Sequence, residues 1–224
     1  AEVLVAYDAA KDEALRRLAE AGITATGRTK SRGTLLDKLR GDNALPNVQD
    51  IAGVRLEALA DRAAQEDMVA QVCDVFGTQD VVKVVDRRTQ PSHGYRAVHV
   101  IVRCDGLPVE VQIRTVLQDG WAQVMERMGD MWGRGLRYGL PDANWQRSVA
   151  TGVTRNDVIA GVLALSEDVA SVEVAGHELH RALVGDAQHA FDERKKAQGR
   201  AEASLRKQLG DVLVMLDQLE ESKR

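Results

Sequence analysis

The sequence predicts an α+β fold with a C-terminal helical extension, and three observations carry this prediction. Residues 95–115 read as a β-hairpin, because two runs of alternating apolar and polar residues flank an Asp-Gly pair at 105–106. Strand-like and helical periodicities are mixed through residues 9–132. From about residue 153, apolar residues recur every three or four positions, which is typical of long amphipathic helices.

The composition suits a soluble globular protein, with one domain and a helical extension or with two small domains. The 224 residues are 44% hydrophobic and 29% charged, with a net charge of −4. This balance gives no hint of DNA or membrane affinity, although a local basic pocket is compatible with it. Cys73 and Cys104 lack metal-ligand spacing, and no secretory signal or membrane-spanning run is evident. We therefore expect a cytoplasmic protein without membrane or DNA partners.

Residues 9–22 are predicted to form the first helix, since their apolar residues recur at helical spacing. The next stretch reads GRTKSRGTLLDKLRGD and is the most basic of the chain. We expect a helix from about Ser31 to Arg40, with Thr34 and Lys38 on one face. Basic groups beside the free amides of a helix N-terminus suit a polyphosphate, and a solvated charged helix start is the alternative.

Residues 50–59, DIAGVRLEAL, are predicted to form a strand that begins at Asp50 and carries Gly53 and Arg55 on one face. An amphipathic helix is expected over residues 62–76, and another strand over residues 79–88. A loop with Pro91 and Gly94 then leads into the hairpin.

The hairpin itself has two unlike faces if Asp105 and Gly106 form its turn. One face is a row of valines ending at Ile113. The other face collects a phenol, an imidazole, a carboxylate, an amide and a guanidinium, from Tyr95, His99, Glu110, Gln112 and Arg114. The alternative is an ordinary solvated outer face, which usually carries Lys, Glu and Thr in no special order. The varied set favours a chemical site laid on a rigid sheet.

After the hairpin, a helix is predicted to run to about Trp132. Its buried stripe is expected at Leu117, Trp121, Val124, Met125 and Met128. Two long helices with apolar seams over residues 158–172 and 205–219 follow, joined near Gly185, and we expect them to pack as an antiparallel pair. The sequence leaves open whether the seams cover the sheet domain, a partner or each other. The histidines of this region read as helix residues rather than metal ligands: His177, His180 and His189.

Four motifs occur in order along the chain. They are Arg28, Lys30, Thr34 and Lys38 in the basic stretch, DIAGVR at 50–55, GYRAVH at 94–99 and VEVQIRT at 109–115. Together they resemble the synthetase domain of the RelA/SpoT family, the small alarmone synthetases in particular, over about residues 23–135. The resemblance implies a nucleotidyltransferase-like mixed β-sheet flanked by helices in residues 1–140, and a C-terminal helical extension in residues 141–224.

The resemblance also implies an ATP-dependent pyrophosphokinase of the stringent response. Such an enzyme makes (p)ppGpp by moving the β,γ-pyrophosphate of ATP onto the ribose 3′-hydroxyl of GDP or GTP. On the ATP side, Arg28 and Arg55 would sandwich the adenine. The triphosphate would be held by Lys30, Thr34 and Lys38.

For the metal and the acceptor, the resemblance assigns further residues. Asp50 and Glu110 would be the catalytic carboxylates that hold Mg²⁺, a cation that takes oxygen ligands. Glu110 could alternatively accept the proton of the 3′-hydroxyl. Tyr95 would stack on the acceptor base. Acceptor-side or supporting roles would fall to His99, Gln112 and Arg114.

One departure concerns the acceptor. Typical alarmone synthetases have a lysine four residues before the tyrosine, whereas this chain has Pro91, with Arg87, Arg88 or His93 as conceivable substitutes. The loop and the segment VLQDGWAQVMERM are similar to the toxic branch of the family. Members of that branch pyrophosphorylate the 3′-terminal adenosine of tRNA and pair with antitoxins. The alternatives to GDP or GTP are therefore a tRNA 3′ end, or an inactive nucleotide-binding module. The C-terminal helices are expected to build a homo-oligomer or to hold an antitoxin.

Overall fold

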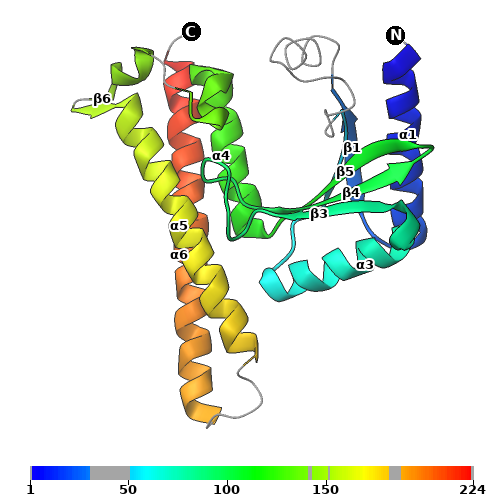
Figure 1. Ribbon diagram of the computed structural model, residues 1–224. Coiled ribbons are helices and arrows are strands. Elements are labelled where there is room, and N and C mark those ends of the chain that lie inside the picture. Colours follow the sequence, from blue (N-terminus) through cyan, green and yellow to red (C-terminus); the bar gives the residue numbers. More distant parts are fainter. Residues whose placement is uncertain (1, 31–50, 141–142, 151, 182–187, 223–224) are drawn as a thin grey trace. The chain divides into compact units, whose positions relative to one another are not determined.

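The computed structural model describes residues 2–30, 51–140, 143–150, 152–181 and 188–222 (Figure 1). The chain divides into two units. The first unit comprises Ala1–Leu59, Ala64–Asp86 and Ala97–Arg114, and the second comprises Ala60–Ala63, Arg87–Arg96 and Thr115–Arg224. The division of function expected between residues 140 and 141 stays a prediction.

The first unit contains a mixed five-stranded sheet with the strand order β1-β2-β5-β4-β3. Its strands are β1 (Ala25–Thr29), β2 (Ala52–Leu56), β3 (Val81–Asp86), β4 (Val98–Cys104) and β5 (Leu107–Ile113). Strands β2 and β5 run parallel, and the other neighbours run antiparallel. The flanking helices are α1 (Glu2–Glu20) and α3 (Arg62–Asp80). The predicted class is thus confirmed.

The β4–β5 hairpin has the predicted register. Cys104 pairs with Leu107, His99 with Gln112, and Val100 with Val111. The turn residues Asp105 and Gly106 have φ values of 49° and 78°. Two positive φ values define the type I′ turn, whose twist matches that of the flanking strands, and this explains why the Asp-Gly pair predicted the hairpin.

One face of the sheet forms the core of the first unit. Val54, Val111 and Val100 lie in one register row and are buried. Helix α1 lies against this face so closely that a Cβ atom on Gly27 would come within 3.0 Å of the Leu15 Cδ1 atom. From α3, the Gln65 Nε2 atom donates to the carbonyl oxygen of Ile113 over 2.9 Å, which ties the helix to the end of β5.

Several boundaries differ from the sequence prediction. Helix α1 begins at Glu2 rather than at residue 9, and α3 continues to Asp80 after an interruption at Gly77. Strand β1 was not predicted, because ATGRT has no apolar alternation and owes its extended conformation to pairing with β2. The helix predicted near residues 31–40 lies outside the described residues.

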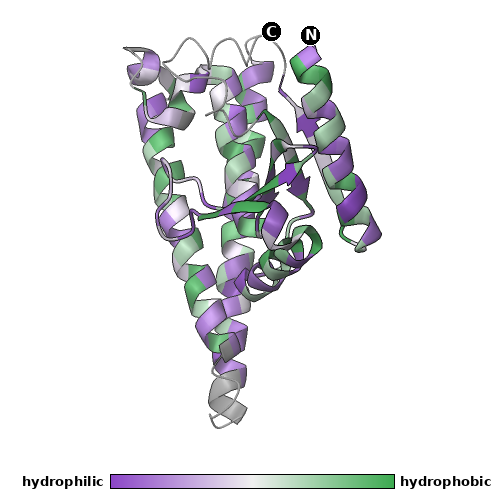
Figure 2. Cartoon of the chain, turned by 45° about the vertical axis from the view of Figure 1, so that its right-hand side comes forward, coloured by the Kyte–Doolittle hydropathy of each residue, from purple (hydrophilic) through white to green (hydrophobic). Residues whose placement is uncertain are grey.

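The second unit contains three long helices around one apolar core, drawn in Figure 2 by hydropathy. They are α4 (Val116–Trp132), α5 (Arg155–Arg181) and α6 (Gln188–Glu221). Short elements accompany them: η2 (Arg134–Tyr138), η3 (Ala143–Gln146), β6 (Ser148–Ala150) and β7 (Val153–Thr154). The predicted stripe of α4 and both predicted seams meet in this core, so each seam packs against its neighbours in the unit. No helix within the described ranges is apolar over a length that would cross a membrane.

A buried polar cluster joins the start of α4 to the middle of α5. Thr115 is the N-cap of α4, and its hydroxyl accepts from the backbone amide of Gln118 over 3.2 Å. Glu173 of α5 accepts from the hydroxyl of Thr115 and, over 2.7 Å, from the Nε2 atom of Gln118. Burial raises the pKa of the Glu173 carboxyl, and these two hydrogen bonds, with Arg62 and Arg88 nearby, lower it by less.

The turn of the hairpin generates a first prediction. Gly106→Ala should lower the free energy of unfolding by about 1–3 kcal/mol, because an alanine is strained at this positive φ. The matched control is Gly199→Ala in α6, where a Cβ atom meets nothing within 4 Å and helix propensity should add about 0.5–1 kcal/mol. Denaturant unfolding measures both, and equal stability of Gly106→Ala and wild type would contradict the turn assignment.

Glu173 generates a second prediction, on pH. A carboxyl whose pKa is raised in the folded state stabilises the fold fully below its unfolded pKa, and this stabilisation is lost as the pH rises through the folded pKa. Glu173→Gln keeps both contacts without the charge, so its melting temperature should rise relative to wild type between pH 4 and pH 8. The exposed Glu178→Gln on the same helix is the control. A pH-independent difference for Glu173→Gln would refute the prediction.

Candidate functional site

The face of the sheet opposite α1 carries most of the described candidate residues. Gly27 faces α1, so the next residue, Arg28, points to the other face. The register pairs Arg28 with Gly53, and Gly53 with Glu110. Paired residues on adjacent strands project to the same side. Arg28 and Glu110 therefore share this face, with Gly53 between them.

Among the described residues, only backbone atoms lie next to Gly53 in this row. A Cβ atom there would have the carbonyl oxygens of Arg28 and Glu110 as its nearest neighbours, at 3.9 and 4.0 Å, which are ordinary contact distances. Packing does not require a glycine here. Because Gly53 has no side chain, a strip of backbone lies uncovered on β2 between Arg28 of β1 and Glu110 of β5.

The adjacent row contains Arg55, Gln112 and His99, which are paired across β2, β5 and β4. Arg55 pairs with Thr26 in β1, which makes it a diagonal neighbour of Arg28. Diagonal positions on one face lie about 7–8 Å apart, a separation that admits a planar ring between two long side chains. Arg28 is exposed and Arg55 is half-buried.

A chain of polar contacts holds the carboxylate of Glu110. The His99 Nδ1 atom lies 2.8 Å from Oε1 of Glu110, and the Nε2 atom of Gln112 donates to Oε2 over 3.0 Å. The Nη2 atom of Arg114 in turn donates to Oε1 of Gln112 over 3.1 Å. Because an ionised carboxylate only accepts, the contact with Glu110 requires the proton of His99 on Nδ1.

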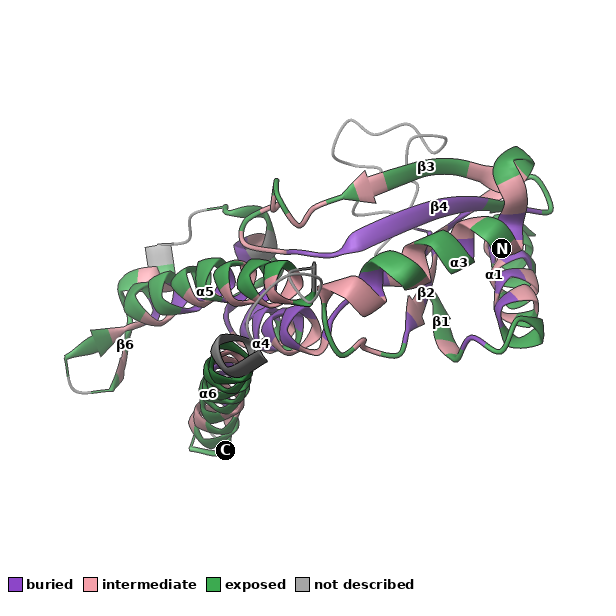
Figure 3. Cartoon of the chain, turned by 90° about the horizontal axis from the view of Figure 1, so that it is seen from below, coloured by how far each residue is buried: buried purple, intermediate pink, exposed green. Residues whose placement is uncertain are grey.

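The part of this face around Glu110 is shielded from solvent. The side chains of His99 and Glu110 are 10% and 13% exposed. Arg114 is buried, as is β4 along most of its length (Figure 3). Charged groups at such burial need partners, and the contacts around Glu110 supply them. The burial is unlike the outer face of an ordinary hairpin.

The remaining ATP-side and metal candidates are only partly described. Lys30 extends the pairing of β1, since its backbone amide donates to the carbonyl oxygen of Ile51 over 2.9 Å. Thr34, Lys38 and Asp50 lie outside the described residues, so the convergence of Asp50 with Glu110 stays a prediction. Within the described ranges, no three His, Cys, Asp or Glu side chains group as metal ligands.

Tyr95 belongs to the second unit, where it ends a tight turn. The backbone of Ser92 and Tyr95 exchanges two hydrogen bonds of 3.0 and 3.3 Å, and the residues between them, His93 and Gly94, have φ values of 52° and 80°. These are the two positive φ values of a type I′ turn. The half-buried Tyr95 packs against the apolar core of this unit.

Arg96 and Ser166, for which the sequence predicted no role, bind this turn. Arg96 is 6% exposed, and its guanidinium donates to Ser166 of α5 and to the backbone of Arg88. Two features of the sequence could have indicated these residues. Arg96 is an arginine within GYRAVH beside a run of apolar residues, and Ser166 is a serine within the apolar seam of α5.

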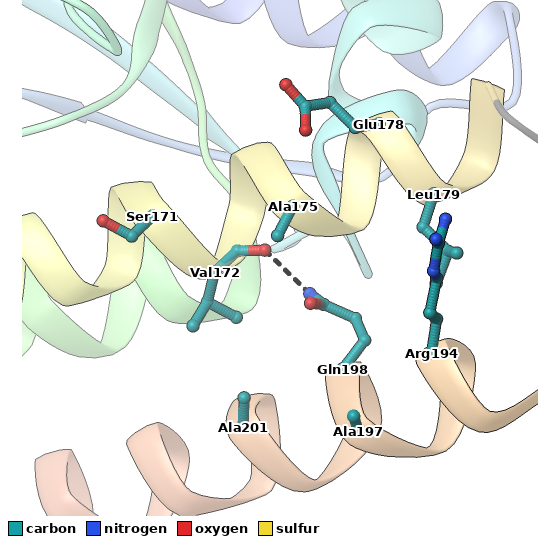
Figure 4. Close-up of a pocket in the computed structure, with 9 residues that line it drawn as sticks. All are labelled: Ser171, Val172, Ala175, Glu178, Leu179, Arg194, Ala197, Gln198 and Ala201. Atoms are coloured by element: carbon teal, nitrogen blue, oxygen red, sulfur yellow. Dashed lines mark hydrogen bonds between the residues drawn. The ribbon is translucent and has the colours of Figure 1, made fainter.

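The second unit also contains a hollow between α5 and α6, with a volume of about 570 Å³ (Figure 4). Gln198 of α6 crosses it and donates to the carbonyl oxygen of Val172 over 2.7 Å. None of the residues that line it is a predicted site residue. The hollow therefore has no part in the candidate site.

The described structure defines an α+β domain with a polar, buried sheet face and a helical second unit. Residues 27–128 match the family model described as "Region found in RelA / SpoT proteins". These residues thus resemble the RelA/SpoT region, as the four motifs predicted.

The chain also resembles other proteins in sequence and in fold. Uncharacterized proteins of Mycobacterium tuberculosis (Rv1366) and Mycobacterium bovis (Mb1401) are 45% identical over 115 residues, which are 50% of this chain and 42% of theirs. The chain thus matches less than half the length of these relatives. Crystal structures of small alarmone synthetases 1 and 2 from Bacillus subtilis have TM-scores of 0.59 and 0.61 at 21% and 19% identity. Each comparison covers 81% of this chain and 96% or 98% of the other, and shows a shared fold.

Proposed function

We propose that this protein is a Mg²⁺-dependent pyrophosphokinase that transfers the β,γ-pyrophosphate of ATP to the ribose 3′-hydroxyl of GDP or GTP. The observation that carries the proposal is the register row Arg28, Gly53 and Glu110, beside the row Arg55, Gln112 and His99. Together these rows place the guanidinium groups of Arg28 and Arg55 and the hydrogen-bonded carboxylate of Glu110 on one face of the sheet. Between Arg28 and Glu110 lies Gly53, which has no side chain. Pyrophosphoryl transfer needs this combination of cationic groups, a carboxylate and fixed geometry more than it needs covalent help.

The arginines form the donor side in this proposal. Their diagonal placement suits an adenine ring stacked between Arg28 and Arg55. Lys30 continues the same strand toward the basic stretch, where Thr34 and Lys38 would add contacts to the phosphates. The overall charge of −4 is no obstacle, because the cationic groups are concentrated in this stretch.

Glu110 forms the reactive side. The 3′-oxygen of the acceptor attacks the β-phosphorus of ATP, the bond from that phosphorus to the α–β bridging oxygen breaks, and AMP leaves. The hydroxyl proton must be accepted, and the Glu110 carboxylate is a base of suitable type. His99 and Gln112 restrain both of its oxygens, so its orientation is fixed before substrate arrives.

The donor set fits a hard divalent cation, because the carboxylate oxygens of Glu110 are ligands of the kind that such a cation prefers, and Asp50 would supply a second carboxylate. Mg²⁺ bound there would neutralise charge on the phosphate oxygens. Cys73 and Cys104 are free thiols, which supports a reducing cytoplasm as the place of the reaction.

A tRNA 3′ end is the second candidate acceptor, and Pro91 is the observation that favours it. A free guanine nucleotide depends on pocket cations for its phosphates, and the usual lysine is absent at this position. A tRNA brings its own electrostatic attachment through its backbone, so it would depend less on that lysine.

Glu110 provides the direct test. Glu110→Gln should lower the transfer rate on the order of a hundredfold, since the amide neither accepts a proton nor carries charge. The control is Asp105→Asn, an equivalent change at the exposed turn of the same hairpin, where asparagine tolerates the positive φ. Both are assayed with γ-labelled ATP, Mg²⁺ and GDP, GTP or deacylated tRNA.

The position of the label discriminates the candidates. Label on GDP or GTP supports the leading proposal, and label only on tRNA supports the second candidate. Wild-type protein that labels no acceptor, while still binding ATP, would favour the inactive nucleotide-binding module.

Gly53 provides a test of the site geometry. Gly53→Val should leave the melting temperature unchanged or higher, because the new Cβ atom meets only ordinary contacts and valine favours strands. It should nevertheless weaken ATP binding roughly tenfold or more by filling the bare strip. The control is Lys83→Val, which puts the same side chain in the same row at the opposite edge of the sheet. ATP affinity equal to wild type in Gly53→Val, measured by calorimetry, would refute the use of this strip.

A further inference from the structure

We propose that α5 positions the acceptor platform, and that Ser166 is its central contact with the turn that carries Tyr95. This inference rests on the proposed function in one respect, since it takes Tyr95 as the acceptor-base platform. It extends that function by giving a helix of the C-terminal extension a part in acceptor binding, through the position of Tyr95. All the contacts that carry it lie within the second unit.

The turn over Ser92–Tyr95 contains a residue in a costly backbone conformation. His93 has a positive φ of 52°, which L-residues with side chains adopt at a cost. Its ring lies against Gly139, where a Cβ atom would come within 2.4 Å of Nε2. Such a turn persists when its surroundings restrain it, so the neighbours of the turn decide where Tyr95 lies.

The turn packs on a surface formed by Trp121 of α4 and Leu163 of α5, which we call the floor of the turn. A Cβ atom on Gly94 would lie 2.7 Å from Cζ2 of Trp121 and 3.1 Å from Cδ2 of Leu163, so the backbone of the turn touches both helices. Trp121 is itself held in place, because its Nε1 atom donates to the carbonyl oxygen of Val162 over 2.7 Å. The floor is thus set by the packing of α5 on α4.

Ser166 adds direct hydrogen bonds to this floor. Its hydroxyl donates to the carbonyl oxygen of Gly94 over 2.5 Å and accepts from the Nε atom of Arg96 over 3.1 Å. The same Nε atom also donates to the carbonyl oxygen of Ser166 over 3.1 Å. Tyr95 therefore lies between two residues that one side chain of α5 binds.

Arg96 extends the restraint to the other end of the loop. Its Nη1 atom donates to the carbonyl oxygen of Arg88, and its Nη2 atom lies 2.8 Å from the Oε1 atom of Glu167. The side chain of Glu167 is 70% exposed, so this ion pair contributes little. The buried guanidinium depends instead on the hydroxyl and carbonyl groups around it.

Helix packing alone does not explain a serine at this position. Ser166 is 1% exposed and lies in the seam of Val162, Leu165 and Val169, where alanine would fill nearly the same volume. A buried hydroxyl is costly unless it is hydrogen-bonded, and the hydroxyl of Ser166 is bonded only to the turn and to Arg96 among the described contacts. Its use is therefore to hold the turn.

The test compares Ser166→Ala with Ser171→Ala. Ser171 is an exposed serine of the same helix whose hydroxyl bonds only its own helix, at the carbonyl oxygen of Glu167. The chain has three tyrosines, so incorporated 3-fluorotyrosine gives a simple ¹⁹F NMR spectrum in which Tyr95→Phe identifies the Tyr95 resonance. Ser166→Ala should shift or broaden that resonance and leave the other two unchanged. An unchanged Tyr95 resonance would overturn the proposal.

Kinetics test the link to the acceptor. In Ser166→Ala, the KM for the acceptor should rise roughly tenfold, while kcat and the KM for ATP stay within about twofold of wild type. Ser171→Ala should match wild type in all three. A shifted Tyr95 resonance with an unchanged acceptor KM would overturn the role in acceptor binding. If wild type transfers pyrophosphate to no acceptor, the proposed function fails, and the NMR result still decides the positioning of Tyr95.

Thermal unfolding establishes that the variants are folded. If Ser166→Ala does not fold, Arg96→Lys replaces it, because lysine keeps the charge but cannot bond Ser166 and Arg88 together. The expected changes in the Tyr95 resonance and in the acceptor KM are the same, and their absence would overturn the proposal in the same way.

Discussion

The register of the β4–β5 hairpin is the constraint on which the rest of the first unit depends. Side chains alternate between the two faces of a sheet, so a slip of one residue would exchange the valine face for the face of His99 and Glu110. The positive φ values at Asp105 and Gly106 exclude that slip by fixing which residues form the turn. Parallel pairing of β5 with β2 then brings Gly53 beside Glu110, and antiparallel pairing brings Arg28 beside Gly53.

Both units bury charged groups and give them partners, but the partners differ in kind. Glu110 lies among His99 and Gln112 on a rigid sheet, where these contacts fix its orientation. Glu173 lies among the N-cap residues of α4, and burial keeps its pKa raised. The first arrangement suits a reacting group, which needs fixed geometry. The second suits a structural link, because it joins a helix start to a neighbouring helix.

The helices after the hairpin do more than extend the domain. Helix α4 begins directly after the last residue of the VEVQIRT motif, and its start is bonded to α5. Helix α5 also contacts the turn before β4 through Ser166 and Leu163. A motif residue, Thr115, and a helix distant in sequence thus share one hydrogen-bonded cluster. The apolar seam of α5 supplies the packing that makes these polar contacts rigid.

The sequence by itself determined what local patterns encode. Alternation and the Asp-Gly pair predicted the hairpin and its register, helical spacing predicted the stripes of α4, α5 and α6, and ordered motifs predicted the family of residues 27–128. Tertiary structure decided the rest. Strand β1 is extended because it pairs with β2. Gly53 lies beside Glu110 because β2 and β5, which are far apart in the chain, pair in parallel. In the sequence, Ser166 is indistinguishable from the other residues of the α5 seam, and only the structure shows its hydrogen bond to the turn. Such pairings depend on groups far apart in the chain, and no local periodicity records them.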